Sequence, residues 1–189
     1  SVLVKAATWL PVLTQLSARA PKSGQELGDS IGVSRAAIWK RVAYLKSLGV
    51  AISANDHGYQ IQGPMYLPNV DLIGQSIEVP VRLEPEVSST NTLVLESRQP
   101  QCLLTLYQNQ GRGRRGRRWV AAPGASLMLS VGQWMAQGIQ EIKGLSLEIG
   151  VSICHYLQVL GLHVGLKWPN DLYHNDKKVS GILIESLSI

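Results

Sequence analysis

The chain has 189 residues, of which 45% are hydrophobic, so it is long enough for one large domain or two small domains with buried cores. No apolar run approaches the roughly 20 residues of a membrane span, and the N-terminus lacks a secretory pattern. We therefore expect a cytoplasmic protein with no membrane association.

The net charge of +5 is unevenly distributed along the chain. Residues 1–62 contain seven Lys and Arg against three Asp and Glu, whereas residues 63–189 contain eleven against ten. Five of those eleven lie between positions 112 and 118, and without them the second part would be acidic. A basic N-terminal part fits a polyanionic partner, and an acidic part with one basic segment fits a focused anion site.

The N-terminal part has the pattern of a helix-turn-helix, which follows an apolar segment over residues 2–18. Ser23 and Glu26 form a capping box at the start of a short helix that ends at Gly32. Ser34 caps a second helix, which ends at Gly49. Two short helices joined by a glycine turn, the second of them basic, predict a DNA-binding unit.

A β-hairpin wing follows the two helices. Residues 52–53 and 59–61 are strand-like, and residues 55–58 form the turn between them. We therefore predict a winged helix-turn-helix DNA-binding domain over residues 1–62. The prolines and the glycine of residues 63–69 break regular structure and predict a linker.

The second helix presents the side chains that could read DNA. The expected outward face carries Arg35, Ala36, Trp39, Lys40 and Lys46. The residues predicted to bind DNA are Ser34, Arg35, Ala36, Trp39 and Lys40. Arginine and lysine at these positions can reach base edges or phosphates in the major groove. The alternative is a helical hairpin whose charges only solvate its surface, and Trp39 could either stack on DNA or fill a gap in the core.

From about residue 70 the pattern becomes that of a mixed α/β domain, which we assign to residues 70–189. The predicted strands are residues 77–81, 103–107, 127–131, 164–168, 171–173 and 179–185, and the predicted helices are residues 90–98 and 142–160. Asn175 and Asp176 predict a tight turn between two antiparallel strands. Cys102 and Cys154 lie in apolar surroundings without metal-ligand spacing, which predicts buried, reduced thiols.

Residues 111–119 read G-R-G-R-R-G-R-R-W. Glycine leaves the backbone free to bend, and each arginine offers a planar, charged fork that grips phosphate or carboxylate in two places. A solvated loop, a disordered RNA-binding segment or a general basic patch would also show such a run. Two predicted strands frame this one, which favours an anion-binding loop that orders around its ligand.

Two smaller polar clusters complete the pattern. Lys167, at the end of a predicted strand, could place a point charge on a phosphate or carboxylate oxygen, and Asn170 and Asp171 offer oxygens suited to Mg²⁺. A polar turn with a salt bridge is the alternative. The run from Ser89 to Asn91 precedes a predicted helix, so it could cap the helix, line an anion pocket, or do both.

In this order, these motifs resemble those of biotin protein ligases of the bifunctional kind that also repress the biotin operon. The resemblance runs from the helix-turn-helix through S-T-N at residues 89–91, the arginine-rich run and K-W-P-N-D-L-Y at residues 167–173. It implies an α+β protein: an N-terminal winged helix-turn-helix plus a mixed-sheet, class II synthetase-like catalytic domain. Because the family continues with a further strand and a small barrel, we expect the catalytic domain to be incomplete at its C-terminus.

The resemblance implies a two-step reaction: biotin and Mg-ATP give biotinyl-5′-AMP, and the biotinyl group then passes to a lysine of biotin carboxyl carrier protein. Lys167 and Arg114 would be catalytic. By position, the biotin site would comprise Ser89, Thr90, Asn91, Gln108, Arg112, Gly113, Arg114 and Lys167. The ATP or adenylate site would comprise Arg115, Trp119, Asn170 and Asp171, and the sequence assigns no metal ligand.

The resemblance also implies regulation. The adenylate would act as corepressor, promote a homodimer and so favour binding to a palindromic operator. One alternative is a regulator that only senses biotin or its adenylate. A lipoate-attaching relative and a nucleic-acid binder that uses the arginine-rich loop are two others. Gln110 and Trp39 depart from the residues expected in the family at their positions.

Overall fold

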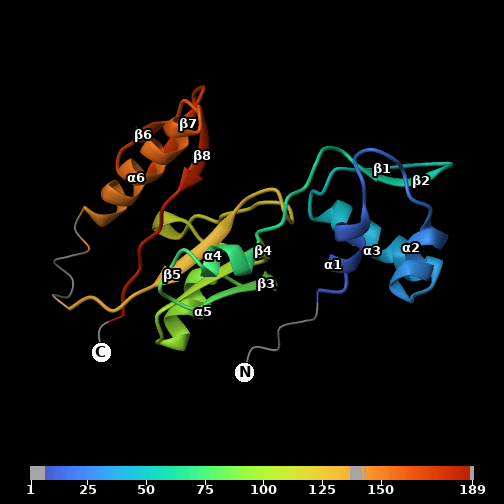
Figure 1. The fold of residues 1–189 in the computed structure, drawn as a ribbon, viewed down its shortest axis with the longest axis horizontal. Helices are drawn as coiled ribbons and strands as arrows, with labels where there is room; N and C mark the ends of the chain where they lie inside the picture. Colours follow the sequence, from blue (N-terminus) through green and yellow to red (C-terminus); the bar gives the residue numbers. More distant parts are fainter. Residues whose placement is uncertain (1–6, 137–141, 143, 188–189) are drawn as a thin grey trace. The chain divides into compact units, whose positions relative to one another are not determined.

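A computed structural model describes residues 7–136, 142 and 144–187. The chain divides into two compact units (Figure 1). The first unit contains Ser1–Gly111 and Trp119–Val131, and the second contains Arg112–Arg118 and Gly132–Ile189. Each unit has its own hydrophobic core.

The first unit begins with the predicted winged helix-turn-helix. Its elements are α1 (Leu10–Gln15), α2 (Gly24–Ile31), α3 (Arg35–Ser47), β1 (Ile52–Asn55) and β2 (Gly58–Ile61). Ser23 Oγ accepts a hydrogen bond from the backbone N–H of Glu26 at 3.0 Å, and Ser34 Oγ accepts one from Ala37 at 3.2 Å. Both predicted helix caps are confirmed, and α1 starts late in its segment, as Pro11 indicated.

The remainder of the first unit is a three-stranded sheet with two helices. Its elements are α4 (Val70–Gly74), β3 (Val81–Val87), α5 (Thr90–Ser97), β4 (Gln101–Gln108) and β5 (Met128–Gly132), and the strand order is β3-β4-β5. Strands β3 and β4 are parallel. Helix α4 packs on β3 and α5 packs on β4 (Figure 1).

The predicted strand over residues 77–81 is wrong, because the first strand of this sheet is β3, which starts at Val81. The centre of β3 consists of Glu84, Pro85 and Glu86, so this strand lacks the apolar alternation by which a strand is recognised in a sequence. Pro85 cannot donate to a ladder, and β3 tolerates it because this strand lies at the edge of the sheet.

The second unit packs one helix on a three-stranded antiparallel sheet. Its elements are a short 3-10 turn (Arg114–Gly116), α6 (Leu145–Val159), β6 (Gly165–Lys167), β7 (Asp171–His174) and β8 (Lys177–Gly181). Its core joins Cys154 of α6 to Val164 and Leu172. The prediction of a strand over residues 179–185 is wrong beyond Gly181, and residue 143 of the predicted helix lies outside the described residues.

The fold confirms the predicted combination of a winged helix-turn-helix with an α+β domain that contains parallel and antiparallel strand pairs. Both cysteines are buried free thiols, as predicted. Among the described residues, no helix has the length and apolar character needed to span a membrane.

Candidate functional site

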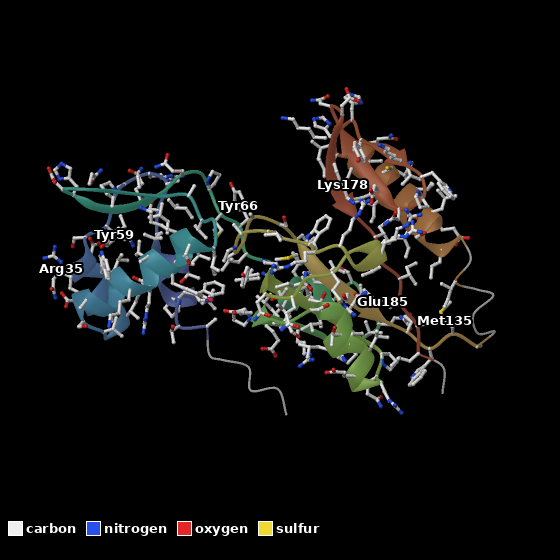
Figure 2. All side chains as sticks on the ribbon, turned by 180° about the vertical axis from the view of Figure 1, so that it is seen from behind. Arg35, Tyr59, Tyr66, Met135, Lys178 and Glu185 are labelled. Carbon is white, nitrogen blue, oxygen red and sulfur yellow. The ribbon has the colours of Figure 1, made fainter. Side chains whose placement is uncertain are left out.

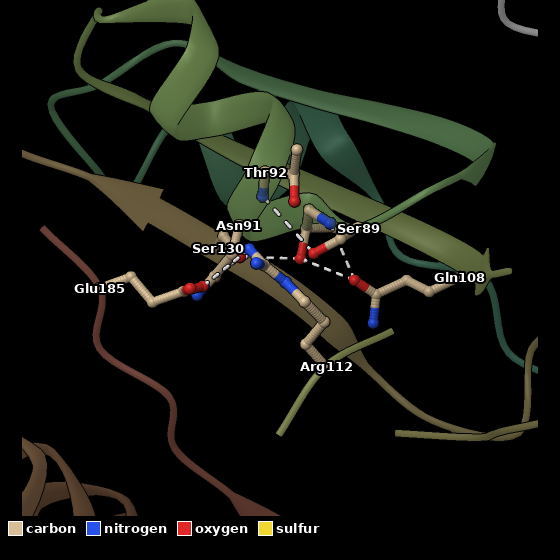
Figure 3. A network of polar contacts seen from close by, with 8 residues as sticks. Ser89, Asn91, Thr92, Gln108, Arg112, Ser130 and Glu185 are labelled. Atoms are coloured by element: carbon tan, nitrogen blue, oxygen red, sulfur yellow. Dashed lines mark hydrogen bonds and ion pairs between the residues drawn. The ribbon is translucent and has the colours of Figure 1, made fainter. Parts of the chain in front are cut away.

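In the first unit, a polar cluster lies where β3 leads into α5 (Figure 3). Ser89 caps α5, because its Oγ accepts a hydrogen bond from the N–H of Thr92 at 3.4 Å. Gln108, at the end of β4, accepts two hydrogen bonds at its Oε1, one from the Thr90 N–H at 2.8 Å and one from the Thr90 hydroxyl at 3.1 Å. The parallel pairing of Val87 with Gln108 brings these two strand ends together.

Ser130 of β5 joins this cluster, although the sequence analysis did not select it. Its hydroxyl donates to Thr90 Oγ1 at 2.7 Å and contacts Asn91 Oδ1 (Figure 3). Ser89, Thr90 and Ser130 are all buried. The signal was a single hydroxyl inside the apolar run of residues 127–131, because a buried polar group needs a polar partner. The predicted residues Ser89, Thr90, Asn91 and Gln108 are thus brought together.

In the second unit, the arginine-rich segment forms a compact turn. The Gly113 N–H donates to the Arg117 carbonyl at 2.7 Å, and Arg112 pairs with Arg118 through a single β-bridge. Arg115 and Gly116 reverse the chain with φ values of 57° and 72°, in the left-handed region where glycine is favoured. These contacts show that the segment has a defined backbone conformation.

Two arginines of this turn reach polar groups of their own unit. Arg112 Nη2 lies 3.1 Å from Glu185 Oε2, and Arg114 Nη1 donates to Asn170 Oδ1 at 3.1 Å. The structure therefore joins the predicted Arg114 to the predicted Asn170. Gly113 and Arg115 lie in the same turn.

Strands β6, β7 and β8 carry a polar face on the side away from α6. Leu172 is fully buried in the α6 core, so its neighbours Asp171 and Tyr173 point to the other face. Lys178 Nζ pairs with Asp171 Oδ1 at 2.8 Å, and Lys167 Nζ lies 4.9 Å from the Tyr173 ring centroid. Figure 2 shows Lys178 on the strands of this unit.

Lys178 is a second candidate cation that the sequence analysis missed. It follows Asn175, Asp176 and Lys177, so it looked like one more solvated charge of a turn. Its position inside β8, opposite Tyr173, became known only from the structure.

The described residues contain no group of three or more His, Cys, Asp or Glu side chains that could hold a metal ion. The oxygens proposed for Mg²⁺ already have cationic neighbours, because Arg114 contacts Asn170 and Lys178 contacts Asp171. This donor set does not fit a resident metal ion. It fits an anion that would replace the carboxylate and amide oxygens beside the cations.

The residues predicted to contact DNA lie on the surface of α3. Ser34, Arg35, Ala36, Trp39 and Lys40 are all exposed, and Trp39 is 62% exposed, so it does not fill the core. Figure 2 shows Arg35 on the helical part of the first unit. Contact of these side chains with DNA stays a prediction.

Comparison with known proteins assigns both parts of the chain. Residues 83–189 match the model of the biotin/lipoate A/B protein ligase family, and residues 9–60 match that of the HTH domain. The chain belongs to the biotin/lipoate A/B protein ligase family. This assignment confirms the resemblance inferred from the arginine-rich and K-W-P-N-D-L-Y motifs.

Among family members, the bifunctional ligase/repressor BirA of Escherichia coli (strain K12) is 40% identical over 170 residues, covering 86% of this chain and 53% of its own length. BirA of Bacillus subtilis (strain 168) is 30% identical over 175 residues, covering 86% and 54%. The chain thus spans about half the length of the curated relatives it matches.

Solved structures of biotin protein ligases show the same fold. The Aquifex aeolicus ligase in complex with biotin and ATP has a TM-score of 0.51 and 32% identity, covering 57% of this chain and 47% of that chain. The Leishmania major ligase in complex with biotin has a TM-score of 0.52 and 27% identity, covering 59% and 53%.

Gly111 and Trp119, which flank the arginine-rich turn, approach each other closely, and this approach can be tested. Gly111 accepts the N–H of Trp119 at 2.8 Å, and a Cβ at position 111 would lie 2.5 Å from the Trp119 carbonyl oxygen. Gly111→Ala should therefore lower the free energy of unfolding by about 1–3 kcal/mol, as expected for overpacking. Denaturant unfolding followed by circular dichroism measures this change.

Gly113→Ala is the matched control within the same segment. A Cβ at position 113 would meet its nearest neighbours at 3.6 and 3.9 Å, which is ordinary van der Waals contact. It should therefore change the stability much less than Gly111→Ala. Equal effects of the two substitutions would contradict the close approach at Gly111.

Proposed function

We propose that this protein activates biotin with Mg-ATP, transfers it to a lysine of biotin carboxyl carrier protein, and represses the biotin operon with biotinyl-5′-AMP as corepressor. The observation that carries the proposal is the cationic cluster of the second unit. In it, Arg114 donates a hydrogen bond to Asn170, and Lys178 forms an ion pair with Asp171. The family assignment and the similarity to bifunctional ligase/repressors support it.

The first step joins two anions, so it needs fixed cations. An oxygen of the biotin carboxylate attacks the α-phosphorus of ATP, the bond from that phosphorus to the bridging oxygen breaks, and pyrophosphate leaves. Negative charge accumulates on the phosphoryl oxygens, where preorganised donors are most effective. Mg²⁺ enters as part of the Mg-ATP substrate, with phosphate and water oxygens as its main ligands.

The second step transfers the biotinyl group from the adenylate to the carrier protein. The neutral amine of the carrier lysine attacks the biotinyl carbonyl carbon, AMP leaves, and the amine loses a proton to form the amide. The adenylate must be protected from water between the two steps, which is the task expected of a loop that closes on it.

We assign the residue roles as follows. The polar groups of biotin would be bound by Ser89, Thr90, Asn91, Gln108 and Ser130. Hydroxyl and amide groups both donate and accept hydrogen bonds, so they suit the donors and acceptors of a neutral polar ring. Arg112, Gly113 and Arg114 would hold the carboxylate and the acyl phosphate. Arg115, Trp119, Asn170 and Asp171 would hold the nucleotide part of the adenylate.

Both Lys167 and Lys178 are candidates for the cation between the carboxylate and the α-phosphate. Lys178 is favoured by its 2.8 Å pair with Asp171, because that contact fixes the ammonium within the cluster that includes Asn170 and Arg114. Lys167 instead lies over the Tyr173 ring. Phosphate oxygens would replace the Asp171 carboxylate beside Lys178 when the nucleotide binds.

We further propose the division into a DNA-binding domain over residues 1–62, a linker over residues 63–69 and a catalytic domain over residues 70–189. An adenylate-promoted homodimer on operator DNA, located in the cytoplasm, completes the proposed function. The alternative, a regulator that only senses biotin or its adenylate, predicts ligand binding without chemistry.

Biotin-dependent exchange of labelled pyrophosphate into ATP tests the ligase function, because exchange requires reversible adenylate formation. We expect exchange with the parent chain and a decrease of about 100-fold or more with Lys178→Gln, the size typical for loss of a group that stabilises transition-state charge.

Lys167→Gln is the matched control and should retain most of the exchange. Absence of exchange in the parent at saturating biotin and ATP would favour the sensor, and a larger loss with Lys167→Gln would reverse the assignment of the lysines.

DNA binding is tested separately on α3. Arg35→Ala and Lys40→Ala should each weaken operator binding, by about fivefold or more where the side chain reads a base, because such contacts contribute about 1–3 kcal/mol. Fluorescence anisotropy with an operator duplex at fixed salt gives the affinity, and pyrophosphate exchange should be unchanged. Parallel loss of both activities would indicate misfolding and contradict a direct DNA contact.

A further inference from the structure

Trp9, at the start of α1, makes a contact that neither DNA reading nor biotin ligation uses. The side chain is 2% exposed, and its Nε1–H donates a hydrogen bond to Glu86 Oε2 at 3.0 Å. The indole N–H is the only polar group of this side chain, and a buried indole normally finds an acceptor. The contact links residues 77 positions apart in the sequence.

Glu86 lies on β3, close in sequence to residues proposed to bind biotin. It pairs with Tyr107 of β4, and the next pair along the two strands is Val87 with Gln108. Three residues after Glu86 comes Ser89, the cap of α5. The other carboxylate oxygen of Glu86 accepts a hydrogen bond from Asn109 Nδ2 at 3.4 Å, so the carboxylate is held from the helical side and from the end of β4.

The apolar surroundings support the same link. Leu106 of β4 is buried in the core of the winged helix-turn-helix, and Tyr107 packs against that core. Val42 and Leu45 of α3 belong to the same core. Tyr44 between them in the sequence is 42% exposed, and its partial burial, followed by the charge of Glu86 and by Tyr107, raises the pKa of its hydroxyl. The DNA-reading helix and the strands of the polar cluster therefore share one packed region within the first unit.

We propose that Glu86 and Trp9 are positioning residues that couple the winged helix-turn-helix to the biotin-binding cluster. The hydrogen bond fixes the end of β3, and through it the placement of Ser89, Thr90 and Gln108 for biotin. The proposal rests on the proposed function, because it takes that cluster as the biotin site.

Direct binding of biotin to the 189-residue chain, measured by isothermal titration calorimetry, tests the coupling. Trp9→Phe keeps the buried aromatic ring and removes the donor, and Glu86→Leu removes the acceptor. Each should raise the Kd for biotin about fivefold or more, since a hydrogen bond to a charged group contributes about tenfold or more to an equilibrium constant. Glu86→Gln retains an acceptor oxygen for the indole N–H but loses the charge, so it should raise the Kd less than Glu86→Leu.

Two controls separate positioning from general destabilisation. Ile38→Val removes a methyl group from the same core without touching Glu86, so it should lower the unfolding temperature and leave the Kd for biotin unchanged. The double variant Trp9→Phe, Glu86→Leu should bind biotin no more weakly than the weaker single variant, because both remove one contact.

The outcomes distinguish the inference from the function on which it rests. A parent chain that does not bind biotin would refute the proposed biotin site and the coupling with it. A parent that binds, together with a Trp9→Phe variant whose Kd is unchanged, would overturn the coupling alone. A Kd that rises equally with Ile38→Val would also overturn it, because stability of the core would then explain the effect.

Discussion

The second unit depends on one electrostatic constraint, the need to place oxygen ligands around closely spaced cations. Five arginines lie within residues 112–118, and Lys178 adds a further cation. In the structure, Glu185 partners Arg112, and Asp171 partners Lys178. The four side chains of these ion pairs are 24–46% exposed, and such pairs contribute only about 0–1 kcal/mol each. An incoming phosphate or carboxylate can therefore replace them at small cost.

The first unit follows a different logic, in which buried neutral groups satisfy one another. Thr90 lies between Gln108 and Ser130, so one hydroxyl joins α5, β4 and β5. A buried cluster of this kind is costly unless every member is bonded, and this requirement fixes the relative placement of β4, β5 and α5. The same donors and acceptors suit a neutral polar ring better than a charged group. The proposed function therefore assigns neutral recognition and anion recognition to different residues of the chain.

Local sequence signals predicted the elements whose cause is local. Ser23 and Ser34 cap their helices as expected, because a capping hydroxyl acts within three residues. The start of β3 was misplaced, because its centre is charged: Glu84 pairs with Arg82 of the same strand, and Glu86 accepts a hydrogen bond from the distant Trp9. No periodicity of residues 81–87 reports a partner 77 positions away.

The site shows the same distinction. The arginine-rich run and residues 89–91 could be recognised, because several unusual residues stand together in each. Ser130 left only a weak signal, one hydroxyl in an apolar run, and Lys178 left none, since the meaning of each depends on the strand register and on a partner from another element. The predicted Lys167 has the expected charge, but the Tyr173 ring beside it became known only from the structure.

A crystal structure of the protein with bound biotinyl-5′-AMP tests the central claim most directly. The account predicts that guanidinium nitrogens of Arg112 or Arg114 and the ammonium of Lys178 lie within hydrogen-bond distance of the acyl phosphate, with the Lys178–Asp171 pair lengthened or broken. A bound adenylate whose phosphate contacts neither the residue 112–118 segment nor Lys178 would contradict it.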